Sequence, residues 1–202
     1  MENIMEVITL KHKTVNAYVI NTNDLCIIVG TGYPESMNIY TKLLIKINTT
    51  FSQIKYLIIT HFHPDHAGLV QQLLDSGIKL LLHEAQKNYL EWINNHFEKH
   101  IHKKYKPIIV ENNENRITLD TEESKMLFKK HKIEGKIIST PGHTNDSITF
   151  IINNKAFIGD LPKYNMNGSY KTEAIKDSWN KILENTVKEI YPGHGEKYKI
   201  EQ

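Results

Sequence analysis

The stretch His61-Phe62-His63-Pro64-Asp65-His66 places three imidazoles and one carboxylate within six residues. It directly follows the apolar run 56–60, Tyr-Leu-Ile-Ile-Thr, which is typical of a buried strand, and a helical pattern of apolar residues begins at 68. The chain therefore leaves a rigid strand and turns tightly, with four metal-ligand side chains in a small volume. Imidazole and carboxylate ligands suit zinc, iron or manganese. A purely structural role is disfavoured, because buried polar side chains need partners and a packed core does not need three neighbouring imidazoles.

The composition is that of an ordinary globular protein. The 202 residues are 40% hydrophobic and 24% charged with a net charge of +2, which predicts a single domain over residues 1–202 and indicates no particular anionic partner. The only cysteine, Cys26, lies in an apolar run and is expected to be buried. The N-terminal residues are polar and acidic, and no apolar stretch has the length of a membrane span. We therefore expect a cytoplasmic protein with neither a secretion signal nor a membrane segment.

Strand and helix patterns alternate along the whole chain. Strands are expected at 5–12, 14–21, 25–29, 56–60, 78–82, 137–138, 147–152, 156–158 and 187–191. Helices are expected from Pro34, at 68–75, near 85–97, at 121–131 and near 175–182. In the helix near 85–97, Trp92 falls at a spacing typical of core residues. The basic segment 94–106 is interpreted as a solvated helix end rather than a nucleic-acid site. This mixture predicts sheets packed together with helices outside them.

Three further ligand-type residues share one local pattern. His143 lies in Pro-Gly-His-Thr, Asp160 follows Ile-Gly, and His194 lies in Pro-Gly-His-Gly, each just after an expected strand. Strand ends at one edge of a sheet converge, so these side chains can meet the first cluster although they are distant in sequence. Together the two sets provide five histidines and two aspartates, enough for two metal ions.

These four motifs, in this order, resemble the metallo-β-lactamase fold superfamily, and the resemblance extends from Asn16 to His194. It implies an α/β fold: a four-layer αββα sandwich of two mixed β-sheets with helices on the outer faces. It also implies two divalent metal ions, with zinc favoured and iron or manganese as alternatives. The first ion would be held by His61, His63 and His143, and the second by Asp65, His66 and His194, with Asp160 bridging both.

One position departs from the pattern of that superfamily. Many relatives carry an aspartate before the Thr-Gly pair that ends the third strand, where this chain has Gly30 in Val-Gly-Thr-Gly. In relatives that aspartate orients a metal ligand, and loss of such support commonly weakens metal affinity or activity about 10–100-fold. We expect Gly30→Asp to tighten metal binding if the backbone φ is negative there, and to strain the turn if φ is positive.

The expected chemistry is hydrolysis by a hydroxide shared between two metal ions. Asp160 would set the metal spacing and Asp65 would orient the hydroxide. Tyr164 either reaches the developing oxyanion or is an ordinary loop tyrosine, and Lys163 has a weaker case for the same role. The remaining histidines lack the Gly/Pro framing and are expected mainly at the surface.

The substrate class follows from the same resemblance. The bridging aspartate is more like glyoxalase II, lactonases and phosphodiesterases than true β-lactamases. The leading interpretation is a hydrolase of a small ester, thioester or lactone. The alternatives are a phosphodiesterase, a mononuclear iron oxidoreductase similar to persulfide dioxygenases, and a metal-holding protein without catalysis. Substrate identity, the metal and the oligomeric state stay open.

Overall fold

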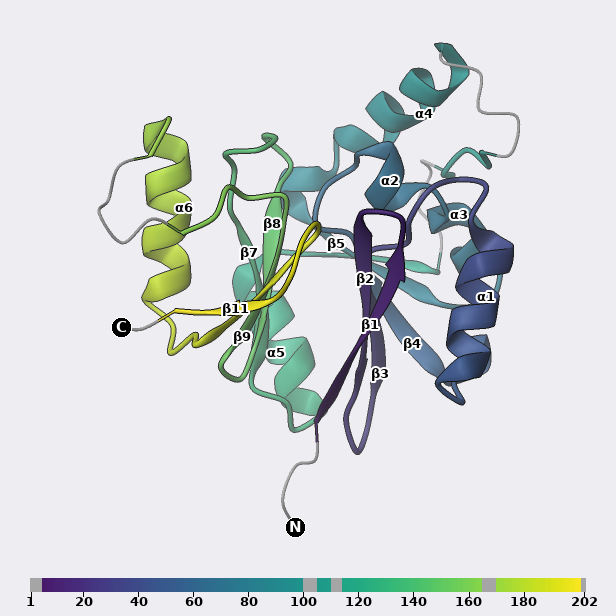
Figure 1. Cartoon of the computed structure of the whole chain (residues 1–202), viewed down its shortest axis with the longest axis horizontal. Coiled ribbons are helices and arrows are strands. Elements are labelled where there is room, and N and C mark those ends of the chain that lie inside the picture. Colours follow the sequence, from purple (N-terminus) through teal and green to yellow (C-terminus); the bar gives the residue numbers. More distant parts are fainter. Residues whose placement is uncertain (1–4, 100–104, 110–113, 165–169, 201–202) are drawn as a thin grey trace.

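The computed structural model describes residues 5–99, 105–109, 114–164 and 170–200, with side chains at 98 and 99 left aside. Two mixed β-sheets pack face to face and helices cover their outer faces, which confirms the predicted αββα sandwich (Figure 1). The six-stranded sheet has the order β1-β2-β3-β4-β5-β6 and the five-stranded sheet the order β11-β10-β9-β8-β7. Within the described ranges, no helix is long and apolar enough to cross a membrane.

The element bounds follow the predicted patterns closely. The strands of the first sheet are β1 Glu6–His12, β2 Val15–Asn21, β3 Cys26–Val29, β4 Ile54–Ile58, β5 Lys79–His83 and β6 Arg116–Leu119. Those of the second sheet are β7 Gly135–Ser139, β8 Ile148–Ile152, β9 Lys155–Gly159, β10 Glu189–Pro192 and β11 Tyr198–Lys199. The α-helices are α1 Met37–Lys46, α2 Pro64–Ala67, α3 Val70–Leu74, α4 Tyr89–Lys99, α5 Thr121–Lys130 and α6 Glu173–Leu183. Two short 3-10 helices, Phe51–Gln53 and Glu84–Gln86, precede β4 and follow β5.

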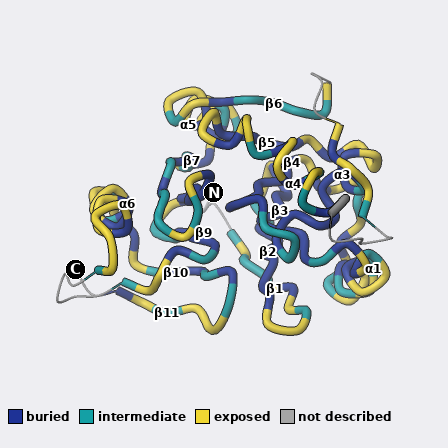
Figure 2. Tube along the Cα trace, turned by 90° about the horizontal axis from the view of Figure 1, so that it is seen from above, coloured by how far each residue is buried: buried dark blue, intermediate teal, exposed yellow. Residues whose placement is uncertain are grey.

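The two faces of each strand serve two different cores, because successive side chains of a strand point to opposite sides. In β3, Ile27 and Val29 enter the core between the sheets, whereas Cys26 and Ile28 pack towards the outer helices. From the second sheet, Phe150 and Phe157 enter the same inner core, where their rings lie 5.9 Å apart at 25°. The apolar strands are therefore buried on both faces, as Figure 2 shows in dark blue.

The outer helices bury one face each. Tyr40 and Leu44 of α1 and Ile93 of α4 pack on the first sheet. Trp179 of α6 packs on the second sheet and donates a hydrogen bond from its indole nitrogen to the carbonyl of Pro162, 2.8 Å away. Helix α5 lies against β7 and places Phe128 in the inner core.

Four local predictions differ from the structure. The helix predicted at 68–75 is two short helices, α2 and α3, and α2 already begins at Pro64. The first long helix begins at Met37 rather than Pro34, because the amide of Ser36 is hydrogen-bonded to the carbonyl of Tyr33 in a separate turn. The predicted core residue Trp92 is 43% exposed. Strands β6 and β11 were not predicted: β6 reads Arg-Ile-Thr-Leu, which is half polar, and β11 has only two residues. Part of the basic segment 94–106 lies outside the described residues.

The two sheets are tied together at the edge where the ligand motifs lie. The β1–β2 hairpin of the first sheet reaches the last ligand loop of the second: Val15 forms an isolated bridge with His194, and the amide of Asn16 donates to the carbonyl of Gly193 at 2.8 Å. The side-chain amide of Asn16 also donates to the carbonyl of Gly195 at 2.8 Å. These bonds fix the β10 exit against the first sheet.

A second tie joins the exit of β4 to the β7–β8 loop. The amide of Ile148 donates to the carbonyl of Thr60 at 2.8 Å, and the amide of Phe62 donates to the carboxylate of Asp146 at 2.7 Å. Asp146 is only 2% exposed, so this bond satisfies a buried charge and holds the His61–His63 turn.

Candidate metal centre

All seven predicted ligands come together at one edge of the two sheets. His61 and His63 follow β4, α2 carries Asp65 and His66, and the other three residues follow or precede strands of the second sheet. Their donor atoms form three overlapping groups within 4.8 Å: His61, His63 and His143; His61, His66 and Asp160; and Asp65, His66 and His194. Strand ends of both sheets thus supply one cluster, as the Gly/Pro-framed motifs predicted.

Asp160 occupies the middle of the cluster. Its Oδ2 lies 3.6 Å from Nε2 of His143 and 3.4 Å from Nε2 of His194. Its Oδ1 lies 3.3 Å from Nε2 of His66, and His61 is 3.9 Å from Oδ2. The carboxylate therefore faces residues of both proposed metal positions, as a bridging ligand must.

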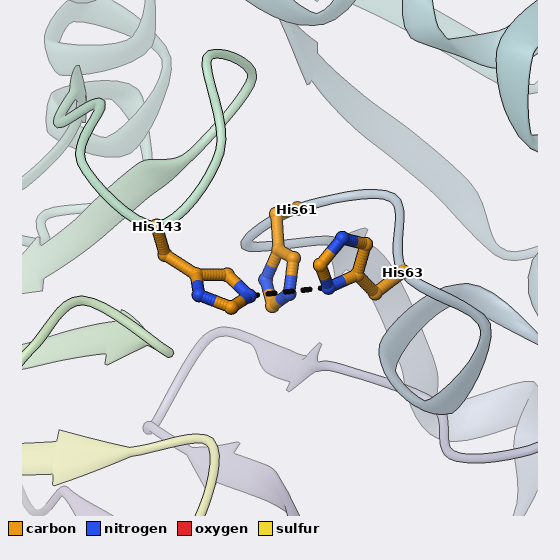
Figure 3. Close-up of side chains that lie close together, drawn as sticks. All are labelled: His61, His63 and His143. Atoms are coloured by element: carbon orange, nitrogen blue, oxygen red, sulfur yellow. Dashed lines mark hydrogen bonds between the residues drawn. The ribbon is translucent and has the colours of Figure 1, made fainter.

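On one side of Asp160 three imidazoles face one another. Figure 3 shows the rings of His61, His63 and His143 pointing towards a common space, with Nε2 of His143 3.1 Å from Nδ1 of His63. The ring centroids are 4.6 Å apart for His61 and His63, and 4.8 Å for His61 and His143. On the other side Asp65 Oδ2 lies 3.2 Å from His194 Nε2.

Hydrogen bonds from the outer ring nitrogens set the direction of two imidazoles. Nδ1 of His194 lies 2.9 Å from the carbonyl oxygen of Thr14, so this nitrogen carries the proton and Nε2 presents its lone pair to the cluster. Nδ1 of His61 lies 3.4 Å from the hydroxyl of Thr60. Such outer partners fix the tautomer and raise the basicity of a metal-binding imidazole.

Three atoms at the centre of the cluster are buried without a hydrogen-bond partner among the described residues: Nε2 of His61, Nε2 of His66 and Oδ1 of Asp160. Leaving a buried polar atom unpaired costs about 1–3 kcal/mol each. Because the atoms are lone-pair donors aimed at one another, a cation between them satisfies all three. The residues therefore fit a metal centre.

The electrostatics favour the ligand forms of these side chains. Burial, together with the neighbouring His66, holds the pKa of His61 well below its ordinary value. Burial and His143 likewise lower the pKa of His63. Burial alone would raise the pKa of Asp160, but the neighbouring imidazole of His66, together with those of His61 and His194, holds it below the usual range. At neutral pH His61 and His63 are therefore neutral imidazoles and Asp160 is an ionised carboxylate, the forms that bind metal ions.

Gly193 is required by the close approach of its loop to two ligands. A Cβ at this position would lie 2.4 Å from Oδ1 of Asp160 and 2.7 Å from Cε1 of His66. Both contacts are far inside van der Waals distance, so a larger residue would push the ligands apart. The Pro-Gly-His pattern therefore has a steric cause here.

Gly30 allows a backbone conformation with positive φ in the turn after β3. Its φ is +79°, a conformation that other residues adopt only with strain, although a Cβ there would meet nothing closer than 3.6 Å. A cavity of about 10 Å³ is lined by Gly30, Asn16, Thr60 and His66 among others, roughly the space of one water molecule. The condition under which Gly30→Asp would tighten metal binding is therefore not met.

Beside the cluster lies an open cavity of about 610 Å³. It is lined by His143, Ile158, Gly159, Asp160, Leu161, Lys163, Pro192, His194, Gly195, Glu196, Lys197 and Tyr198. The ammonium of Lys163 lies 4.9 Å from the ring centre of Tyr198, and Lys197 lies 5.7 Å from that of Tyr191. Glu196 is paired with Lys11 at 3.1 Å. Two lysines thus face this cavity while its exposed carboxylate is already neutralised.

Tyr164 is placed differently from the ligands. Its ring packs against Trp179 with 5.2 Å between centroids, and its amide donates to the hydroxyl of Tyr198 at 3.4 Å. It is absent from the cavity lining, whereas Lys163 is part of it. An oxyanion role for Tyr164 stays a prediction.

Two residues near the centre were missed at the level of sequence. Asp146 holds the first histidine turn through the amide of Phe62, and its only signal is its position three residues after His143. Trp92 has its ring centroid 6.2 Å from that of His63. Its helical spacing suggested a core residue, and only the packing of α4 reveals otherwise.

Comparison with known proteins agrees with this architecture. The family model described as the metallo-beta-lactamase superfamily matches residues 11–194. A Caenorhabditis elegans protein called beta-lactamase-like protein 2 homolog is 27% identical over 194 residues, which cover 89% of this chain and 55% of that protein. A lactamase-like protein of Pestalotiopsis microspora is 26% identical and matched over 49% of its length. The chain thus spans about half the length of these curated relatives.

Solved structures show the same fold. An archaeal metallo-beta-lactamase superfamily protein from Sulfolobus tokodaii superposes with a TM-score of 0.69 at 20% identity, covering 98% of this chain and 82% of that one. The subclass B3 metallo-beta-lactamase BJP-1 of Bradyrhizobium japonicum gives 0.66 at 18% identity, covering 96% and 76%. At these identities the likeness concerns the fold alone.

Replacing Asp160 with Asn should reduce the metal content of the purified protein below that of the wild type. One of the two oxygens becomes an amide that cannot ligate, so the loss in affinity should exceed the roughly 10–100-fold cost of losing an outer partner. Elemental analysis and chelator competition measure both quantities. The matched control is Asp177→Asn on the exposed face of α6. Wild-type metal content in Asp160→Asn would contradict the bridging position.

Replacing Gly30 with Asp should destabilise the fold by about 1 kcal/mol or more, because φ is positive there, and should leave metal binding no tighter. Gly30→Ala carries the same strain without a carboxylate, so it separates the two effects. Urea unfolding reports the stability and chelator competition the affinity. Tighter metal binding in Gly30→Asp than in Gly30→Ala would show instead that a carboxylate beside His66 improves the site.

Proposed function

This chain belongs to the metallo-beta-lactamase superfamily, whose members are generally metal-dependent hydrolases, and we propose that it hydrolyses a small ester, thioester or lactone with two divalent metal ions. The observation that carries the proposal is the central carboxylate of Asp160. Its two oxygens face different histidines, with Oδ1 towards His66 and Oδ2 towards His143 and His194. A single ion would not need a carboxylate with donors on both sides.

The roles of the ligands follow from their grouping. His61, His63 and His143 would hold the first ion, and Asp65, His66 and His194 the second, with Asp160 shared. Nitrogen and oxygen donors of this kind suit zinc, with iron and manganese as alternatives. Two such ions, when bound, activate a water molecule as the nucleophile and polarise the carbonyl of the substrate.

The protein's own side chains position the reaction. Asp160 fixes the separation of the two groups, and Asp65, 3.2 Å from His194, can accept a proton from the attacking water. A side-chain nucleophile is not needed, and Cys26 is unsuited to be one. Burial raises the pKa of the Cys26 thiol to about 11, and the side chain packs in the outer core of the first sheet.

The cavity beside the centre favours a negatively charged substrate. Lys163 and Lys197 line it, with their ammonium groups 4.9 Å and 5.7 Å from the ring centres of Tyr198 and Tyr191, and the charge of Lys197 also acts on the carboxyl of Glu189. An anionic group on the substrate would pair with these ammonium groups and place the scissile carbonyl over Asp160. The bond that breaks is the acyl–oxygen or acyl–sulfur bond.

The purified protein should contain two zinc-like ions per chain and hydrolyse thioesters, esters or lactones at a rate that rises with pH around neutrality. The rise reflects ionisation of the nucleophilic water, and lower pH also protonates the imidazoles. Elemental analysis and assays on thioacetate, lactone and bis(p-nitrophenyl) phosphate probes test this. One iron per chain, with oxygen consumed on a persulfide and no hydrolysis, would overturn the proposal. Cleavage of the phosphodiester probe alone would mean that the substrate is a phosphodiester rather than an ester, thioester or lactone.

The double variant Lys163→Ala/Lys197→Ala should raise KM for an anionic thioester several-fold, because each exposed ion pair contributes up to about 1 kcal/mol. The probes are 3-(acetylthio)propanoate and its uncharged amide, whose KM should change little. The effect should shrink with added salt. Lys42→Ala on α1 is the matched control. Equal changes for both probes would mean that the lysines do not recognise the anion.

A further inference from the structure

Helix α4 has an aromatic face that its packing does not explain. Leu90, Ile93 and Phe97 bury one side of the helix in the outer core of the first sheet. Trp92 and His96, four residues apart, lie on the other side, where their rings stack 5.2 Å apart at 25°. Trp92 is 43% exposed. The second tryptophan of the sequence, Trp179, is fully buried.

This aromatic face lies beside the metal centre. The ring centroid of Trp92 is 6.2 Å from that of His63, with 39° between the planes. His63 and His143 are the solvent-accessible members of the first ligand group, whereas His61 is buried. Figure 1 shows α4 rising next to α2 at the end of the sheets where the ligand loops lie. Trp92 therefore borders the open side of the first metal position.

An exposed tryptophan forgoes a large gain in hydrophobic burial, about 25 cal/mol for each Å² of apolar surface left in water. At this position the imidazole of His96 stacks on the indole of Trp92, which stays 43% exposed. A rigid, supported ring next to a reactive centre is suited to stack on a planar group, because offset and edge-on ring pairs gain binding energy beyond the area they bury.

We propose that Trp92, supported by His96, is a specificity-determining residue that stacks on an aromatic ring of the substrate, so that the site prefers acyl compounds with a planar unsaturated group near the scissile bond. This inference rests on the proposed function, because the bond that breaks is the acyl bond of the proposed hydrolysis. The lysine-lined cavity lies beside His143, Asp160 and His194, and the Trp92 wall lies beside His63. The preferred substrate thus carries an anionic group on one side and a planar ring on the other.

Two thioesters of matched reactivity test the preference: S-(2-phenylethyl) thioacetate and S-(2-cyclohexylethyl) thioacetate. In the metal-loaded protein, Trp92→Ala should raise KM for the phenyl compound about 3- to 10-fold with kcat little changed, and should alter KM for the cyclohexyl compound less. Trp92→Phe keeps a planar ring and should restore most of the preference. His96→Ala should give a smaller loss in the same direction.

Met126→Ala on α5 removes another exposed apolar side chain, 61% exposed, and is the matched control. Equal KM changes for the two probes in Trp92→Ala would show that the residue only covers the site, and would overturn the proposal. A ratio of the two KM values, phenyl to cyclohexyl compound, that is the same in Trp92→Ala as in the wild type would also overturn it.

A binding measurement keeps this inference separate from the proposed hydrolysis. The non-hydrolysable probe 3-(4-nitrophenyl)propionate should quench the fluorescence of the wild-type protein, because a nitroaromatic ring in contact with Trp92 quenches it. In Trp92→Phe only the buried Trp179 emits and the quenching should vanish. Quenching without any hydrolysis would refute the proposed hydrolase activity but support stacking on Trp92. Hydrolysis without quenching would refute stacking on Trp92 but support the hydrolase activity.

Discussion

The structure depends on one electrostatic constraint: five imidazoles and two carboxylates converge in a small volume with their lone pairs facing one another. Nε2 of His61, Nε2 of His66 and Oδ1 of Asp160 are buried there without a hydrogen-bond partner among the described side chains. No group among the described residues satisfies these atoms. A bound metal ion would, and the surrounding fold holds the ligands in place for it.

That task falls to the edge where the two sheets meet. Hydrogen bonds between the β1–β2 hairpin and the loop of His194 hold the ligand loops of one sheet against the other, as does the bond that the carboxylate of Asp146 accepts from the amide of Phe62. The inner core of alternating strand side chains lies directly beneath. Asp160 directly follows β9 and His194 follows β10, so the ends of buried strands set the positions of these ligands.

Sequence patterns predicted the layers and the ligand cluster because the signals for both lie in short, contiguous stretches of sequence. Apolar runs such as Ile27 to Val29 indicate strands, and Gly/Pro turns mark each ligand. Features set by three-dimensional packing were not predictable. The exposure of Trp92 depends on which face of α4 meets the sheet, and the positive φ of Gly30 depends on the turn after β3. Asp146 stood outside the recognised motifs, and its role emerges only where two distant loops meet.

The most direct test is a crystal structure of the zinc-loaded protein with anomalous data collected on both sides of the zinc edge. We expect two anomalous peaks, one among His61, His63 and His143 and the other among Asp65, His66 and His194, with the carboxylate of Asp160 in contact with both. A single peak, or a pair of peaks of which Asp160 touches only one, would contradict the dinuclear site.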